Sequence, residues 1–121
     1  MQKCINIRLS LVLTLIIALL VAHDAMAGTI TIDDCHTHFI NRIEGIATGF
    51  RDKINEIQDE FKARLEKCDD IFNKDEREAC IEGAKETAEA LRTKATKTAE
   101  ALRDGAKLIL EACLKQVLQG L

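Results

Sequence analysis

The four cysteines that follow residue 27 are the residues best placed to do covalent chemistry, and that chemistry is disulfide formation. The first two lie 33 positions apart, and so do the last two. This mirrored spacing is expected of two antiparallel segments that fold back near residue 74 and are joined at both ends. An even number of cysteines in a short secreted chain is typical of a disulfide framework. The four residues are Cys35, Cys68, Cys80 and Cys113.

Two histidines beside the first cysteine raise the alternative of a metal site. His36 and His38, with Cys35 and Asp34, offer the side-chain types that bind zinc. Structural zinc usually requires four convergent ligands, whereas residues two positions apart on a helix point in different directions. Cys35 is also needed for a disulfide. We therefore expect solvent-exposed histidines and no bound metal.

No other set of residues predicts a reaction. The sequence has no Ser-His-Asp arrangement within a supporting motif and no Gly-rich phosphate loop. The acidic pairs Asp33-Asp34 and Asp69-Asp70 fall near expected helix ends, where carboxylates serve as caps and as solubilising charge. We therefore predict a protein that is not an enzyme, with no catalytic residues and no cofactor.

The first 27 residues have the pattern of a secretory signal peptide. Lys3 and Arg8 form a basic start, Leu9–Ala22 is an almost unbroken apolar run, and Ala25–Ala27 is a small-x-small cleavage site. The alternative is an uncleaved membrane anchor. An apolar run of 14 residues is short for that role, because a spanning helix needs about 20. We predict cleavage before Gly28, a secreted protein and no stable membrane insertion afterwards.

Removal of residues 1–27 also removes Cys4. It leaves one domain, residues 28–121, with four cysteines, an even number that can pair completely in disulfides. That domain has 15 basic and 19 acidic residues, a net charge of −4. Nucleic-acid binders usually show a basic excess, so we expect no nucleic-acid partner. The chain contains no proline and is rich in Ala, Glu, Lys, Leu and Arg, a composition that favours long helices.

Between the cysteines runs an apolar repeat of eleven residues. Steps of four, four and three from Cys35 to Phe72 meet only apolar residues or cysteine, and the same steps from Cys80 to Leu121 meet no polar residue. Eleven residues in three turns is about 3.67 per turn, so the apolar stripe stays on one helix face. Such a helix pair should be nearly straight or coil weakly to the right, unlike a heptad coiled coil. Strands are unexpected because alternation of period two is absent after residue 35.

Folding the two stripes about residue 74 places large side chains of the first segment opposite small ones of the second, which favours close packing. The cysteines then form the two end layers of the core. The predicted inner pairs are Ile46 with Leu102, Ile57 with Leu91, Phe50 with Ala95 and Ala99, and Phe61 with Ala84 and Ala88.

The reach of the chain selects one disulfide pairing if the helices are continuous. A helix of 33 residues spans about 50 Å, whereas disulfide-linked Cα atoms lie about 5.5–6 Å apart, so neither Cys35–Cys68 nor Cys80–Cys113 can form. Cys35–Cys80 with Cys68–Cys113 would need parallel helices and a 12-residue connector longer than its maximum of about 43 Å. The remaining pairing is Cys35–Cys113 with Cys68–Cys80, and each bond should add about 2–4 kcal/mol of stability.

These patterns predict an all-α fold, a long antiparallel helical hairpin joined by two disulfides. We expect a first helix at about residues 33–72, a turn at about 73–75 and a second helix at about 75–119. Asn73 followed by Glu76 resembles a capping box, and Gly120 suits a helix end. Breaks near Gly45–Gly49 or Gly105 would instead bend the two rods into a shorter bundle.

Two further interpretations concern surfaces. Amphipathic eleven-residue repeats also occur in helices that lie on lipid surfaces, and a hairpin that opened could bind lipid or a membrane surface in that way. Apolar residues outside the main stripe could form a second face, and those near the open end could support a homodimer. These residues are Ile40, Ala47, Ile71, Leu108, Ile109 and Leu114.

The chain resembles small secreted insect proteins that combine a signal peptide, four cysteines and an almost wholly helical mature region. Among them, the male accessory-gland (seminal-fluid) proteins of fruit flies look closest. The resemblance covers the whole chain and rests on the four cysteines and the helical character between them. It implies transfer in seminal fluid and action on mated females or stored sperm through an unknown protein partner or receptor. Similar four-cysteine helical proteins could also come from insect gut, saliva or venom, and those settings stay open.

Overall fold

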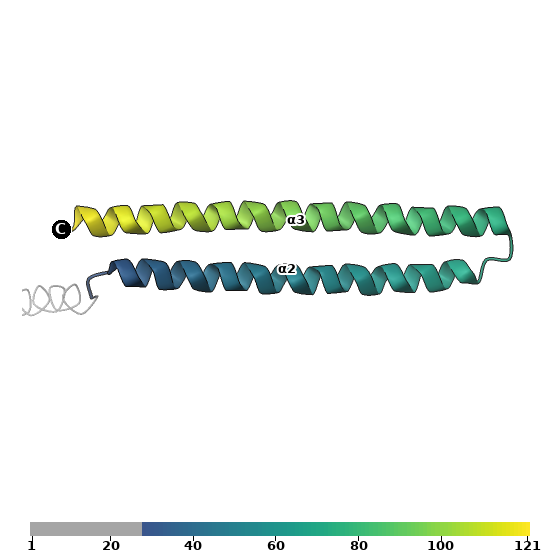
Figure 1. Ribbon diagram of the computed structural model, residues 1–121, viewed down its shortest axis with the longest axis horizontal. Helices are drawn as coiled ribbons and strands as arrows, with labels where there is room; N and C mark the ends of the chain where they lie inside the picture. Colours follow the sequence, from purple (N-terminus) through teal and green to yellow (C-terminus); the bar gives the residue numbers. More distant parts are fainter. Residues whose placement is uncertain (1–27) are drawn as a thin grey trace, which may run out of the picture. The chain divides into compact units, whose positions relative to one another are not determined.

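The computed structural model describes residues 28–121, and this part of the chain is all-helical. Two long helices, α2 (Ile32–Asp69) and α3 (Lys74–Gln119), lie side by side and run in opposite directions (Figure 1). They form one compact unit, Ile32–Leu121. The prediction of an antiparallel helical hairpin is therefore confirmed. The predicted signal peptide, residues 1–27, lies outside the described residues.

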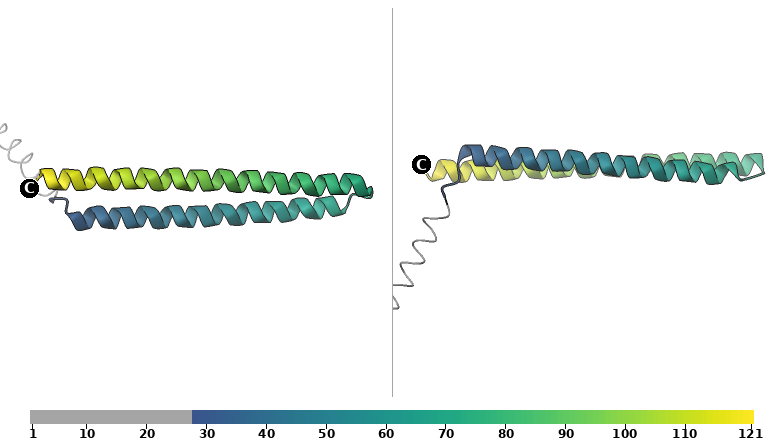
Figure 2. Two further views of the ribbon diagram at one scale, coloured as in Figure 1. Left: turned by 45° about the horizontal axis from the view of Figure 1, so that its top comes forward. Right: turned by 90° about the horizontal axis from the view of Figure 1, so that it is seen from below.

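Both helices continue without interruption past their glycines. They cross at a shallow angle along the length of the hairpin (Figure 2). This geometry is expected of an eleven-residue repeat, because its period nearly matches that of a straight helix. The alternative of a shorter bundle, bent near Gly45–Gly49 or Gly105, is therefore wrong.

The core is a thin seam in which large side chains of α2 pack against small side chains of α3. Ile57 is only 2% exposed and lies with Phe61 opposite Ala84 and Ala88 in a closed part of the seam. Small residues on one side let the two backbones approach closely without leaving voids. The buried residues of the hairpin are Cys35, Ile57, Cys68, Ala84, Ala88, Ala99 and Ala106.

The connection between the helices lies earlier in the chain than predicted. Helix α2 ends at Asp69 instead of at about residue 72, and residues 70–73 form the link where a turn at 73–75 was expected. The N–H of Ile71 donates to the carbonyl oxygen of Cys68 at 3.1 Å and closes the last turn. Phe72, the expected last member of the apolar stripe, is consequently fully exposed.

Asn73 explains why α2 must stop early. It is the N-cap of α3, with an extended backbone (φ −73°, ψ 125°), and its side-chain oxygen accepts hydrogen bonds from the N–H groups of Asp75 and Glu76 at 2.9 and 3.1 Å. An N-cap residue lies outside the helix that it starts and satisfies N–H groups that lack helical partners. A first helix that ran to Phe72 would leave no residues in which the chain could reverse before this cap.

The outer ends of the helices agree closely with the prediction. Helix α2 begins one residue early, directly after Thr31, and Asp33 therefore falls in its first turn, where carboxylates interact favourably with the helix dipole. At the other end Gly120 is the C-cap of α3. Its N–H lies 3.2 Å from the carbonyl oxygens of both Gln116 and Val117.

Candidate functional site

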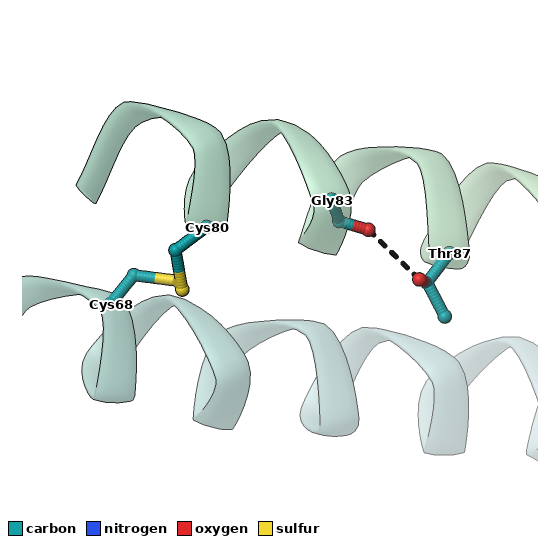
Figure 3. Close-up of a disulfide and its surroundings, with 4 residues drawn as sticks. All are labelled: Cys68, Cys80, Gly83 and Thr87. Atoms are coloured by element: carbon teal, nitrogen blue, oxygen red, sulfur yellow. Dashed lines mark hydrogen bonds between the residues drawn. A yellow bond between two sulfur atoms is a disulfide. The ribbon is translucent and has the colours of Figure 1, made fainter. Parts of the chain in front are cut away.

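Two disulfides join the helices, one near each end of the hairpin. Cys35 is bonded to Cys113 with their Cα atoms 5.8 Å apart, and Cys68 is bonded to Cys80 with a Cα separation of 5.6 Å. This is the pairing that chain reach predicts. The Cys68–Cys80 bond bridges α2 and α3 beside the connection (Figure 3). Cys35 and Cys68 are fully buried, so they are the end layers of the core as well as cross-links.

The structure does not bring the candidate zinc ligands together. Cys35 is consumed by its disulfide, and both His36 and His38 are exposed to solvent. Among residues 28–121 no group of three or more histidine, cysteine or acidic side chains is arranged to hold a metal ion. In the same part of the chain, neither helix has a stretch long and apolar enough to cross a membrane.

A groove between α2 and α3 lies in the half of the hairpin nearer the start of α2 and the end of α3. We call it the glycine groove, because Gly45 and Gly49 of α2 and Gly105 of α3 line it. Its volume is about 740 Å³. Most of the remaining lining is apolar. That lining includes Ile46, Phe50, Leu91, Ala95, Leu102 and Ile109.

The groove exists because the glycines that line it have no side chains. A Cβ atom built on Gly45, Gly49 or Gly105 would meet no atom within 4 Å, so these glycines face open space and do not serve close helix packing. The same seam is filled towards the connection. There Glu60, Arg64 and Thr87 flank it, and the open volume falls to about 0 Å³.

The closed part of the seam shows how polar side chains can cover it. The Thr87 hydroxyl donates to the carbonyl oxygen of Gly83 at 2.8 Å, next to the Cys68–Cys80 bond (Figure 3). Arg64 lies across one turn of α2 from Glu60, and their side chains form an ion pair at 2.9 Å. No comparable pair spans the glycine positions in the described residues, and the apolar seam there stays accessible.

Leu102 departs from its predicted place in the core. It was expected to form an inner layer with Ile46, yet it is 54% exposed, whereas Ile46 is partly covered. The cause is the neighbouring glycines of α2, which carry no side chain that could cover it. Ile109, further along α3 and also in the lining, is 47% exposed.

The glycine groove was not predicted, but a sequence signal for it exists. The mirror that pairs Cys35 with Cys113 places Gly45 opposite residue 103, Gly49 opposite Ala99 and Gly105 opposite residue 43. Three glycines therefore fall within a few turns of each other on the two facing helices. Scanning each helix for apolar periodicity misses this, because a glycine does not interrupt the stripe beside it.

The charged side chains of the groove all have one sign. Arg42, Lys53 and Lys94 belong to its lining, which contains no carboxylate. The hydroxyl of Thr98, another lining residue, is already used, because it donates to the carbonyl oxygen of Lys94 at 3.0 Å. The groove therefore combines an apolar floor with a cationic border.

Comparison with known proteins provides no relative from which to assign a role. The chain matches no family model, and neither the curated proteins nor the solved structures contain a significant match to it.

Proposed function

We propose that this chain is a secreted, non-enzymatic protein that acts by binding another molecule. The observation that carries the proposal is the glycine groove, an apolar concavity in a hairpin whose helices are covalently joined at both ends. Disulfides form and persist in oxidising compartments, which agrees with an extracellular location. A rigid scaffold lowers the conformational cost of binding because little has to be ordered when the partner arrives.

The setting that we propose is reproductive. It rests on the resemblance to accessory-gland proteins of fruit flies, and it implies a partner in the mated female or on sperm. Gut, salivary and venom proteins of similar architecture are the alternatives. Antibody staining of source tissues distinguishes them: we expect label in the male accessory gland, and label confined to gut, salivary or venom gland would contradict the reproductive setting.

Secretion is tested by expressing the full chain in insect cells and sequencing the protein that is released. We expect a mature N-terminus at Gly28. Leu15→Arg, which interrupts the apolar run of the leader, should keep the protein in the cells, whereas the matched Leu15→Ile should not. Release of the uncut chain, or retention of the unaltered chain, would contradict the proposal.

Lipid-surface binding by an opened hairpin is the competing function. It requires the two apolar stripes to leave each other, and the two disulfides oppose that separation. Liposome binding that rises when the disulfides are reduced would favour this alternative. Binding that does not respond to reduction would argue against it.

A further inference from the structure

We propose that the glycine groove binds a long-chain fatty acid, with its carboxylate between Lys53 and Lys94 and its acyl chain extended towards Ile109. This inference rests on the proposed binding function and names a ligand class for it. No opening of the hairpin is needed, because the groove is already accessible in the folded, doubly cross-linked protein.

The apolar floor has the length and character of a single acyl chain. The groove follows α2 from Arg42 to Lys53, which at 1.5 Å per residue is about 16 Å. One acyl chain covers about half of a bilayer's hydrocarbon core of roughly 30 Å, or about 15 Å. Leu102 and Ile109 offer half-exposed apolar surface along this path. Covering that surface is favourable because it removes apolar area from water.

The positions of the charged residues indicate which end of the groove holds the carboxylate of the fatty acid. The mirror that the disulfides establish places Lys53 opposite residue 95, at the level of Lys94, so these two lysines line the same end of the groove. Lys53 pairs with Glu56 at 3.0 Å on the surface, a contact weak enough to exchange for a ligand carboxylate. Lys94 takes part in none of the ion pairs found among residues 28–121.

Charge also decides between a fatty acid and a second copy of the chain. In a two-fold dimer the same patch of each copy faces its partner. The cationic border, Arg42, Lys53 and Lys94, would then meet an identical cationic border without any carboxylate from the groove. Like charges placed together across an interface are unfavourable. An anionic, elongated and apolar ligand satisfies both the border and the floor.

The first test is titration with oleate, below the concentration at which it forms micelles. The protein is the full chain expressed in insect cells and purified with both disulfides intact. Gly49→Leu fills the groove and should weaken oleate binding by about tenfold or more, the effect of losing contact with about two methylenes. Gly83→Leu is the matched control, because Gly83 is an exposed α3 glycine in open space outside the groove. It should leave the affinity unchanged.

The second test reverses single charges, which leaves the packing intact. Lys94→Glu should weaken oleate binding by about fivefold, and added salt should reduce that difference. Lys62→Glu, on the exposed surface of α2 outside the groove, should have no such effect. Arg42→Glu should cost less than Lys94→Glu, because Arg42 lies at the other end of the groove. Oleyl alcohol should bind more weakly than oleate and respond little to Lys94→Glu.

Three results would overturn the assignment. The first is absence of saturable oleate binding, which would leave a secreted binding protein with another partner. The second is equal loss from Gly49→Leu and Gly83→Leu, which would place oleate elsewhere. The third is a dimer in sedimentation that Gly49→Leu dissociates, which would assign the groove to a second copy. A failure of secretion is detected separately, by whether the protein is found in the medium or in the cells. It does not affect the oleate-binding measurements, which use purified protein.

Discussion

Cys35, near the start of α2, is bonded to Cys113, near the end of α3, although 78 positions of sequence separate them. Their Cα atoms lie 5.8 Å apart, so the two ends of the hairpin are joined as closely as the two helices beside the connection. A hairpin this thin buries only a narrow seam of apolar surface. Cross-links at both ends therefore contribute a large share of its stability.

The two disulfides should contribute unequally. Cross-linking removes conformational entropy from the unfolded chain, and the amount removed grows with the logarithm of the number of residues in the loop that it closes. The loops here have sequence separations of 78 and 12. By this relation, replacing Cys35 and Cys113 by alanine should cost about 4–5 kcal/mol, above the typical 2–4 kcal/mol because the closed loop is long, and replacing Cys68 and Cys80 should cost about 3 kcal/mol.

Chemical unfolding followed by circular dichroism measures both costs, and peptide mapping without reduction verifies the bonds. Equal costs, or a larger cost at the Cys68–Cys80 bond, would contradict the loop-length explanation. Mapping that linked Cys35 to Cys68 would contradict the hairpin itself, because those residues lie at opposite ends of α2.

Phe61 should matter for stability, and Phe72 should not. Phe61 is partly buried and lies opposite Ala84 and Ala88, whereas Phe72 is fully exposed in the link between the helices. Phe61→Ala should cost about 2–3 kcal/mol, below the range of about 3–5 kcal/mol for a fully buried phenylalanine because the ring is not fully covered. Phe72→Ala should change stability by less than about 0.5 kcal/mol. Thermal unfolding of the two variants checks this prediction. Similar losses of stability in both would be inconsistent with a link at residues 70–73.

Asn73→Ala should destabilise the hairpin by about 1 kcal/mol, because it removes the acceptor for the N–H groups of Asp75 and Glu76. Asn41→Ala is the matched control, since Asn41 is an exposed asparagine inside α2. It should be neutral or slightly stabilising, because alanine favours the helix. If denaturant midpoints moved equally in both variants, Asn73 would have no special role as a cap.

Gly45→Ala should stabilise the protein by about 1 kcal/mol, because alanine is the better helix former and its Cβ would meet no atom within 4 Å. Gly83→Ala should give a similar gain at a position outside the groove. Unfolding midpoints of the two variants provide the comparison. A loss of stability at Gly45 alone would show that this glycine is needed for close packing.

Much of the fold could be read from particular residues. The cysteine spacing and the length of a 33-residue helix allow only an antiparallel hairpin with the observed pairing. Asn73 identifies the start of α3, because a cap is a local hydrogen-bonding arrangement that depends on few residues. The end of α2 could not be read in this way. Phe72 continues the apolar repeat, and only the space needed to reverse the chain before Asn73 removes it from the helix.

The sequence by itself determined which face of each helix is apolar and which ends are joined, because these follow from local periodicity and chain reach. The tertiary structure alone decided where the seam is closed and where it is open. Leu102 and Leu91 occupy the same repeat position, yet only Leu102 lies mostly exposed. The difference arises on the other helix, where Gly45 and Gly49 provide no side chain to cover it. The burial of a side chain depends on both helices of an interface. The glycine groove exists because the apolar stripe of α3 lies opposite glycines of α2 there.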